Sequence, residues 1–222
     1  MENTSHAAHI VRRLVLQNYE AWKGEPREVL QPPKPNPYVD PNFGILVYPD
    51  PRGYTVYATA GASAMVQPHI RAESGPEQGV RFEYLMHGSD EDAEAICEIL
   101  DRVTMYPFQV KTPTDSGSVL PLGTDFQAAL GGQIHSLFLT YPYEADPRIY
   151  TTTPWGQIQK AGQIIQTLWV IPIYQDEAEL ILRKGPESFE ERCVPGSFRA
   201  YDWHRPSVLR KPGRRKPGGR KS

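Results

Sequence analysis

The stretch Ile164–Leu182, IIQTLWVIPIYQDEAELIL, decides the fold. Its first half, Ile164–Tyr174, is short and rich in β-branched and aromatic residues, and Pro172 would break a helix, so the pattern predicts a strand. Apolar residues on both of its faces place this strand deep inside a sheet. Pro172 has no N–H to donate, so we expect ladder pairing to stop there. From Gln175 the spacing becomes helical. The expected apolar side of this helix consists of Ala178, Ile181 and Leu182.

The composition limits the possible architecture of the protein and its cellular compartment. A chain of 222 residues with 39% apolar residues predicts one compact body with a tail, and 22 prolines and 18 glycines indicate many loops. Cys97 and Cys193 are too few for a disulfide framework or a paired zinc ligand set, so we interpret them as reduced and mostly buried thiols. No apolar run approaches the ~20 residues of a membrane span and no leader opens the chain, so a soluble, cytoplasmic protein is expected.

The net charge of −2 hides a division between body and tail. Residues 205–222 contain eight lysines and arginines and no acid, which leaves 16 basic and 26 acidic residues in 1–204, a charge of −10. An acidic body repels phosphates, so we do not expect the folded domain itself to bind nucleic acid. The same charge suits a cationic partner protein.

The chain divides into four predicted parts. Residues 1–24 have the apolar spacing of an amphipathic helix, and residues 25–41 contain six prolines, which favour an extended spacer on the surface. Residues 42–198 carry the strand and helix patterns of the body. Residues 199–222 are predicted to be a basic, disordered tail, because this composition cannot bury apolar surface.

The sequence patterns in the first half of the body predict strands. Phe43–Tyr48 and Tyr54–Thr59 flank a proline and glycine turn and predict a hairpin. Ala60–Gly79 begins with small residues and becomes polar, which suggests a long exposed loop. Val80–Met86 alternates apolar and mostly polar residues, the pattern of a strand with one buried face.

The second half adds helices and another strand. Ser89–Asp92 fits a capping box, and the apolar stripe that follows predicts a helix ended by Pro107. Residues 112–132 look irregular, and Ile134–Thr140 predicts a strand. After the central strand and its helix, Glu187–Cys193 predicts a last short helix.

Several short motifs follow one another in a recognisable order. They are YTVYATAGAS (54–63), VRFEYLMHG (80–88), MYPF (105–108), PLG (121–123), IHSLFLTYP (134–142) and LWVIPIYQDEAEL (168–180). Their order and spacing over Phe43–Cys193 resemble the suppressor-of-fused domain of bacterial, single-domain proteins. The proline-rich segment and the basic tail lie outside this pattern.

The resemblance implies a non-enzymatic α+β domain: a mixed, largely antiparallel sheet flanked by helices, in one domain with a basic C-terminal tail. In animals, suppressor of fused sequesters Gli-type transcription factors and grips a short peptide that adds as a β-strand. Only one of the two domains of the animal protein has a counterpart here, so half of that peptide site is missing. Bacterial relatives are often proposed to be immunity proteins that neutralise polymorphic toxins.

A loop after the predicted strand Ile134–Thr140 concentrates aromatic and acidic residues, which are favoured binding anchors. The candidate partner-binding residues are Tyr141, Tyr143, Glu144, Asp146, Tyr150 and Trp155. In the alternative interpretation, these side chains only cover the end of the sheet. A partner strand could instead pair with an open sheet edge.

The tail offers a second candidate surface, for nucleic acid or for an acidic partner, because basic side chains displace counterions from phosphates. Its candidate residues are Arg210, Lys211, Arg214, Arg215, Lys216, Arg220 and Lys221. Alternatively, the tail is a solvated, disordered segment, or it folds back onto the acidic body.

Motifs for chemistry are absent from the sequence. His69, His87 and His135 lie in separate elements without metal-ligand spacing, so no metal, cofactor or catalytic residue is expected. His87 and Cys97 could form a base and nucleophile only if folding brought them together. The sequence therefore predicts a module that binds and occludes a partner protein, as an immunity or regulatory protein. A nucleic-acid-associated protein is the first alternative, and an unrecognised hydrolase is the second.

Overall fold

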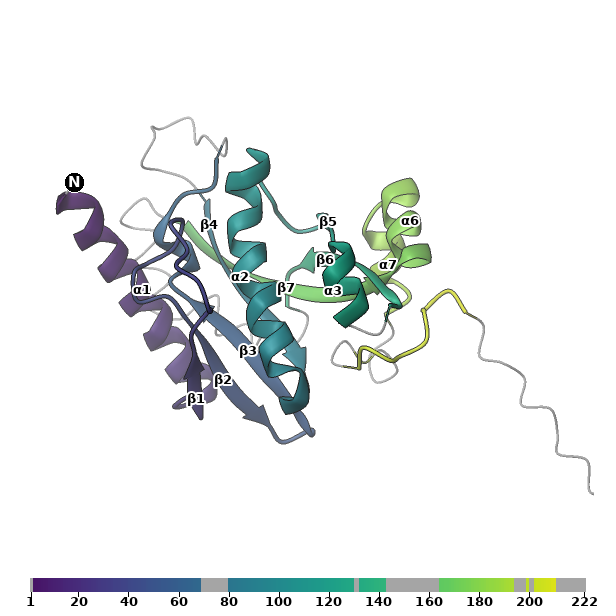
Figure 1. Cartoon of the computed structure of the whole chain (residues 1–222), viewed down its shortest axis with the longest axis horizontal. Coiled ribbons are helices and arrows are strands. Elements are labelled where there is room, and N and C mark those ends of the chain that lie inside the picture. The colour runs from purple at the N-terminus through teal and green to yellow at the C-terminus, as the bar shows by residue number, and fades with distance from the viewer. Residues whose placement is uncertain are drawn as a thin grey trace, which may run out of the picture.

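The computed structural model describes residues 2–68, 80–129, 132–142, 164–193, 199 and 202–210. Within these residues, seven strands form one sheet in the order β1-β2-β3-β4-β7-β6-β5 (Figure 1). The strands are β1 (Glu28–Leu30), β2 (Gly44–Asp50), β3 (Tyr54–Ala60), β4 (Val80–Gly88), β5 (Val119–Pro121), β6 (Ile134–Thr140) and β7 (Ile164–Tyr174). Within the described residues, no helix combines the length and the hydropathy that a membrane crossing requires.

Strand β7 lies in the middle of the sheet, as the sequence predicts. It pairs in parallel with β4, from Val80 opposite Ile164 to Met86 opposite Val170. It pairs antiparallel with β6 on its other side, and every other strand pair of the sheet is antiparallel. The expectation of a mixed, largely antiparallel sheet is therefore confirmed.

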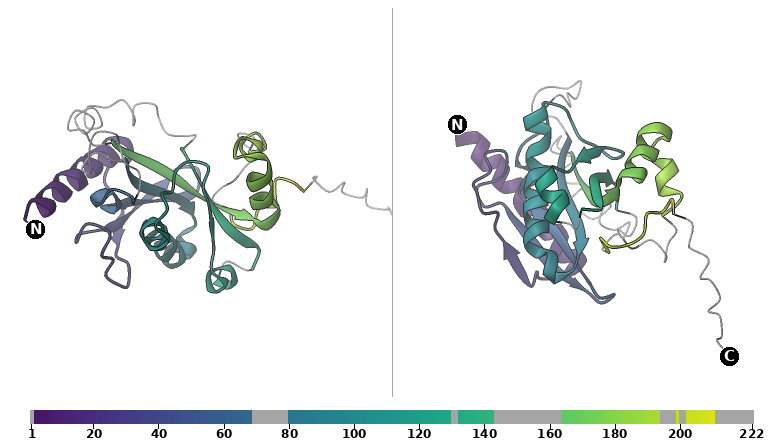
Figure 2. Two further views of the ribbon diagram at one scale, coloured as in Figure 1. Left: turned by 90° about the horizontal axis from the view of Figure 1, so that it is seen from above. Right: turned by 45° about the vertical axis from the view of Figure 1, so that its right-hand side comes forward.

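Helices cover both faces of the sheet (Figure 2). Helix α1 (Glu2–Lys23) lies on one face, and α2 (Ala93–Val110) and α3 (Thr124–Ala129) lie on the other. Helices α6 (Gln175–Lys184) and α7 (Glu187–Glu190) follow β7 directly, and the short 3₁₀ turns are η1 (Ala62–Ala64) and η2 (Asp90–Asp92). Two apolar cores result, because α2 and α3 close one core and α1, α6 and α7 close the other. This arrangement confirms the α+β prediction.

Two proline predictions need correction. Helix α2 does not end at Pro107 but continues to Val110, since Pro107 is buried in the core and the helix closes one turn later at Lys111. Pairing of β7 with β4 stops at Val170, yet pairing with β6 continues past Pro172 to Tyr174. The carbonyl of Pro172 accepts from Arg205 on the side of β7 away from β6, so the nitrogen of Pro172 faces that side too and its missing N–H removes no bond from the ladder with β6.

Burial differs from the sequence patterns at three other places. Strand β4 is buried on both faces, because α1 covers the side on which Arg81 and Glu83 lie. The predicted exposed loop from Ala60 instead begins with η1, whose Ser63 is fully buried. Leu182 is 76% exposed, and the apolar side of α6 uses Leu180 in its place.

The ends of the body also differ from the expected boundaries. The proline-rich segment contributes β1, which forms one edge of the sheet, and so it is more than a spacer. Residues 202–210, assigned from sequence to the tail, pack onto the body with Trp203, Arg205 and Ser207 buried. We call residues 202–210 the C-terminal strap. The six basic residues of 211–222 then leave 18 basic and 26 acidic residues in 1–210, a charge of −8.

Candidate partner-binding site

An apolar groove with a volume of about 450 Å³ lies between α2, β5, α3 and the proline-rich segment. Its floor is made of side chains that belong to the core, among them Ile99, Val103, Leu120, Leu122 and Phe126. Polar and half-buried side chains of α2 form its rim. This volume falls within the ~300–1,000 Å³ of typical ligand pockets, which are also mostly apolar.

The proline-rich segment forms one wall of the groove because two contacts fix it to α2. The Nδ2 atom of Asn36 donates to Asp101 Oδ1 at 2.8 Å and to Thr104 Oγ1 at 3.0 Å. The ring of Tyr38 stacks on Phe108 with centroids 4.7 Å apart and an interplanar angle of 2°. Pro33, Lys34 and Pro35, just before these anchors, line the groove. Its shape therefore depends on contacts between residues about 65 positions apart.

Replacing Asn36 with alanine should loosen this wall. The change leaves the carboxylate of Asp101, whose pKa burial already raises, without a donor. We expect a loss of about 1–2 kcal/mol in the free energy of unfolding and faster proteolysis around residues 33–38. Urea denaturation and limited proteolysis measure the two effects. The exposed Asn42 is a matched control, and an equal effect of Asn42→Ala would contradict the role assigned to Asn36.

A second, smaller hollow of about 160 Å³ lies on the face of the sheet that α1 covers. Trp22, Lys23, Arg52, His87 and Trp169 are among the residues that line it. Lys23 and Arg52 both pair with the carboxylate of Asp50 at 2.9 Å. Aromatic side chains therefore line much of this hollow, and Asp50 partly neutralises the charges of Lys23 and Arg52.

His87 in this hollow is held between two aromatic rings. The centroids of Tyr54 and Trp169 each lie 4.8 Å from the centroid of its imidazole. Burial, together with the charges of Lys23 and Arg52, lowers the pKa of His87 to about 3. The neutral imidazole is thus an apolar packing element.

Acidification should therefore destabilise the fold through His87. The unfolded chain takes up this proton near pH 6.5 and the folded chain only near pH 3, so stability falls as the pH drops through this interval. We expect the imidazole NMR signals of His87 to stay constant between pH 5 and 8. A His87→Phe variant should lose less stability on acidification than the wild type. Titration of His87 near pH 6.5 would show that its surroundings are not as described.

The fold separates the residues that might have formed a catalytic pair. His87 is half-buried beside Trp169 on the face of the sheet that α1 covers, whereas Cys97 lies in the core under α2, on the opposite face. Burial raises the pKa of Cys97 to about 11 and that of Cys193 to about 12. Among the described residues, no three side chains of His, Cys, Asp or Glu gather as a metal site would require. His69 lies outside the described residues.

Glu83 forms a buried polar network that sequence analysis missed. Its carboxylate accepts five hydrogen bonds of 2.5–3.3 Å, from Thr59 Oγ1, Ser63 Oγ and the backbone N–H groups of Gly61, Ala62 and Ser63. Burial raises the pKa of Glu83, and the bonds from Ser63 and Thr59 partly offset this effect. The network fixes η1 to β4. A glutamate alternating with apolar residues resembles an ordinary solvent-facing position, so the pattern gave no signal.

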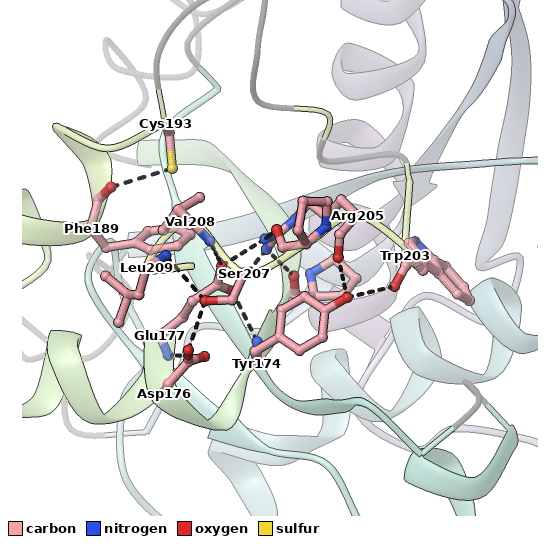
Figure 3. A network of polar contacts seen from close by, with 12 residues as sticks. Tyr174, Asp176, Glu177, Phe189, Cys193, Trp203, Arg205, Ser207, Val208 and Leu209 are labelled. Atoms are coloured by element: carbon pink, nitrogen blue, oxygen red, sulfur yellow. Dashed lines mark hydrogen bonds and ion pairs between the residues drawn. The ribbon is translucent and has the colours of Figure 1, made fainter. Parts of the chain in front are cut away.

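Arg205 forms a second buried network, which holds the C-terminal strap (Figure 3). Its guanidinium donates to the carboxylate of Glu177 at 2.6 and 2.9 Å and to the carbonyl of Pro172 at 3.0 Å. Glu177 also accepts from the backbone N–H groups of Tyr174 and Val208 at 2.9 and 2.8 Å. The Tyr174 hydroxyl donates to the carbonyl of Arg205. The strap thus occupies the side of β7 that β4 leaves open.

A comparison with protein-family models matches residues 40–206 to the suppressor of fused protein (SUFU) family. The chain belongs to this family. The match ends within the strap, just after Arg205, which agrees with the packing of this segment onto the SUFU domain. No curated protein sequence matches the chain.

Solved structures also share the SUFU fold with this chain. A SUFU homologue from Neisseria gonorrhoeae superimposes with a TM-score of 0.61 at 14% identity, over 90% of this chain and 98% of that one. A chain from the crystal structure of the Sufu–Fu complex gives a TM-score of 0.56 at 14% identity, over 91% and 92% of the two chains. At this identity the similarity concerns the fold.

The residues predicted to bind a partner are described only at Tyr141, which follows β6 in the SUFU domain. Tyr141 is 41% exposed, and its single hydroxyl hydrogen has two acceptors within reach, Gln166 Oε1 at 3.2 Å and Asp115 Oδ1 at 3.4 Å. The neighbouring Pro142 lines the smaller hollow rather than the apolar groove. The other predicted residues, Tyr143, Glu144, Asp146, Tyr150 and Trp155, lie outside the described residues.

Of the basic residues predicted to contact nucleic acid, only Arg210 is described, and it is exposed at the end of the strap. The others, Lys211, Arg214, Arg215, Lys216, Arg220 and Lys221, lie outside the described residues. The sequence count of eight basic tail residues also included Arg205, which is buried and paired with Glu177. This arginine lies inside the SUFU domain and is not part of an exposed basic tail.

Proposed function

We propose that this chain is a cytoplasmic, non-enzymatic module that binds a partner protein and occludes part of its surface, as a toxin-immunity or regulatory protein. The observation that carries this proposal is an apolar groove open at the surface of a SUFU domain. A relative with the same fold is named in a complex of Sufu with Fu. Two free cysteines suit a reducing compartment such as the cytoplasm.

The groove suits a partner better than the described sheet edges do. Both edge strands, β1 and β5, are three residues long. Leu122 donates its N–H to the carbonyl of His135 in β6. Neighbouring residues of a strand direct their backbone groups to opposite sides, so the backbone of Pro121 faces away from β6. Proline has no N–H to donate to a partner strand there. A partner strand would therefore find few free backbone N–H and C=O groups on either edge. Apolar anchors that enter the groove would bury more surface.

A catalytic role has little support in the described side chains. Burial raises the pKa of both thiols and lowers that of His87, which is the opposite of what an activated cysteine and a general base require. The charge of −8 over residues 1–210 favours a cationic protein partner, because opposite charges steer association.

Cross-linking in the source cells, followed by mass spectrometry, tests the proposal by identifying a partner for reconstitution. We expect the purified chain and the purified partner to form a complex of fixed stoichiometry. If the partner is a toxin, co-expression of the chain should restore growth. A purified chain that forms no stable complex with any cross-linked protein would refute the proposed function.

Nucleic-acid association through the tail is the second candidate, since residues 211–222 carry six basic residues and no acid. The test is deletion of residues 211–222, which leaves Arg205 and the strap in place. The deletion should abolish a salt-sensitive retention on DNA or RNA. Unchanged retention would discard this alternative.

A further inference from the structure

Strand β7 and helix α6 form a binding site for an arginine side chain, which the strap fills. The fully buried carboxylate of Glu177 accepts two bonds from the guanidinium of Arg205, at 2.6 and 2.9 Å. The carbonyl of Pro172 accepts a third at 3.0 Å, and the ring centroid of Tyr174 lies 5.4 Å from the guanidinium carbon. A carboxylate, a carbonyl and an aromatic ring are suitable partners for a desolvated guanidinium. We call Pro172, Tyr174 and Glu177 the arginine pocket.

Side chains, rather than a strand ladder, hold the strap on the body. Among the described residues, no backbone-to-backbone hydrogen bond joins the strap to β7 or α6. Beyond the arginine pocket, Ser207 Oγ donates to Asp176 Oδ2 at 2.8 Å, and the N–H of Val208 donates to Glu177 at 2.8 Å. The strap is therefore held in the way that a protein holds a short bound peptide, at one site where β7 meets α6 (Figure 3).

Apolar side chains of the strap add contacts on both sides of this site. Trp203 belongs to the core that α2 closes, and Val208 and Leu209 pack against the other core. The site thus accepts the sequence Trp-x-Arg-x-Ser-Val-Leu of residues 203–209. Every copy of the chain carries this segment, so a second copy is an occupant whose complementarity to the site is already established.

The strap can leave one body without disturbing the sheet. All the described strands and helices precede it in the sequence, so its withdrawal breaks no strand pairing. Eight residues, 194–201, separate Cys193 from the strap, and a chain of that length spans at most about 30 Å. Exchange of an identical element between two copies reproduces the contacts of the closed chain, and it is a low-cost route to a dimer.

We propose that the arginine pocket also binds the strap of a second copy of the chain, so that two copies exchange straps. The proposal goes beyond the proposed function and does not depend on it. In the exchanged dimer, Arg205 of each copy pairs with Glu177 of the other. A short connection gives the chain's own strap an effective concentration on the order of millimolar, so the closed monomer prevails in micromolar solution. Exchange prevails where docking within one chain is weakened.

Two variants with complementary defects test the exchange on the full chain. Glu177→Gln leaves Arg205 without its counter-charge, and Arg205→Met leaves Glu177 without its counter-charge. In an exchanged dimer of the two variants, one pocket regains the native pair and the other carries neither charge. Because a lone buried charge is strongly destabilising, we expect the mixture to form a heterodimer that unfolds at a higher temperature than either variant. Light scattering of differently tagged chains and thermal unfolding measure these effects.

A second mixture provides the matched control. Glu83→Gln and Glu177→Gln both change the body, so an exchange of straps removes neither defect. This mixture should form no heterodimer and should gain no stability. If either variant of the complementary pair does not fold alone, recovery of its helical circular dichroism on mixing is the readout.

The isolated strap gives an independent measurement. Peptide DWHRPSVLR reproduces residues 202–210, and DWHMPSVLR differs from it only at the arginine. The first peptide should bind the Arg205→Met chain at least about tenfold more tightly than the second, because only the first restores the buried charge pair. The NMR shifts that it causes should map to residues 172–177.

The outcomes decide the proposal without involving the groove. A heterodimer in the complementary mixture but not in the control, with binding that depends on the arginine of the peptide, supports strap exchange. No gain on mixing, or equal binding of the two peptides, would overturn it. The proposed function stands in either case, since its test concerns a complex with another protein.

Discussion

Replacing Arg205 with alanine should lower the free energy of unfolding by about 3–5 kcal/mol, because it leaves a buried carboxylate without its counter-charge. The side chain of Glu177 is fully buried and that of Arg205 is 6% exposed, so solvent cannot replace the missing partner. The carbonyl of Pro172 also loses its donor. Urea denaturation at pH 7 measures the effect.

Arg210 provides the matched control, since it lies in the same strap but is exposed. Arg210→Ala should change stability by less than about 0.5 kcal/mol. Deletion of residues 211–222 should leave stability unchanged, whereas deletion of residues 202–222 should destabilise as much as Arg205→Ala or more. Equal stability of the two truncated chains would show that the strap is no part of the folded body.

Replacing Glu83 with alanine should cost at least about 3 kcal/mol, since each buried donor left unsatisfied costs about 1–3 kcal/mol. Five donors from β3, η1 and Gly61 between them converge on this carboxylate. The alanine variant should also lose amide protection at Gly61–Ser63 in hydrogen exchange. Glu94→Ala, at an exposed position of α2, is the control and should have little effect.

Glu83 should also give the fold a recognisable pH dependence. Burial raises its folded pKa above the value in the unfolded chain, so the folded state holds the proton more tightly. The stability contributed by this protonated form is present below about pH 4.3, the unfolded pKa of glutamate, and is lost as the pH rises through the folded pKa. Glu83→Gln should remove this decline. An unaltered pH profile in that variant would contradict the assignment.

Local patterns were sufficient for the central elements. The β-branched run in β7, the switch to helical spacing at Gln175 and the capping box at Ser89 all depend on neighbouring residues, and each agrees with the structure. The prediction at Pro107 was wrong because the core around α2 compensates for a proline near a helix end. Tertiary packing can thus override a local preference.

The buried charges could not be predicted, because their partners are distant in sequence. Glu83 is 20–24 residues from its donors, and Arg205 is 28 residues from Glu177. From sequence alone, Glu83 belongs to an alternating strand and Arg205 to a basic tail. Glu83 is buried because α1 covers its side of the sheet, and Arg205 is buried because the strap packs against β7.

The candidate groove could not be predicted for the same reason, because it joins segments that are distant in sequence. It joins the proline-rich segment, α2, β5 and α3, and the sequence shows only a spacer, an apolar stripe and an irregular region at these places. The aromatic loop was chosen for its composition, and only Tyr141 of it is described. The acidic character of the body was visible from charge counting, whereas the groove was not visible in any local pattern.

Hydrogen exchange of the chain, alone and in complex with its cross-linked partner, tests the central claim most directly. We expect the partner to protect residues 98–109 and 119–126, which border the apolar groove, and to leave the exchange of α6 unchanged. Protection confined to another surface of the described domain, with the groove peptides unaffected, would contradict it.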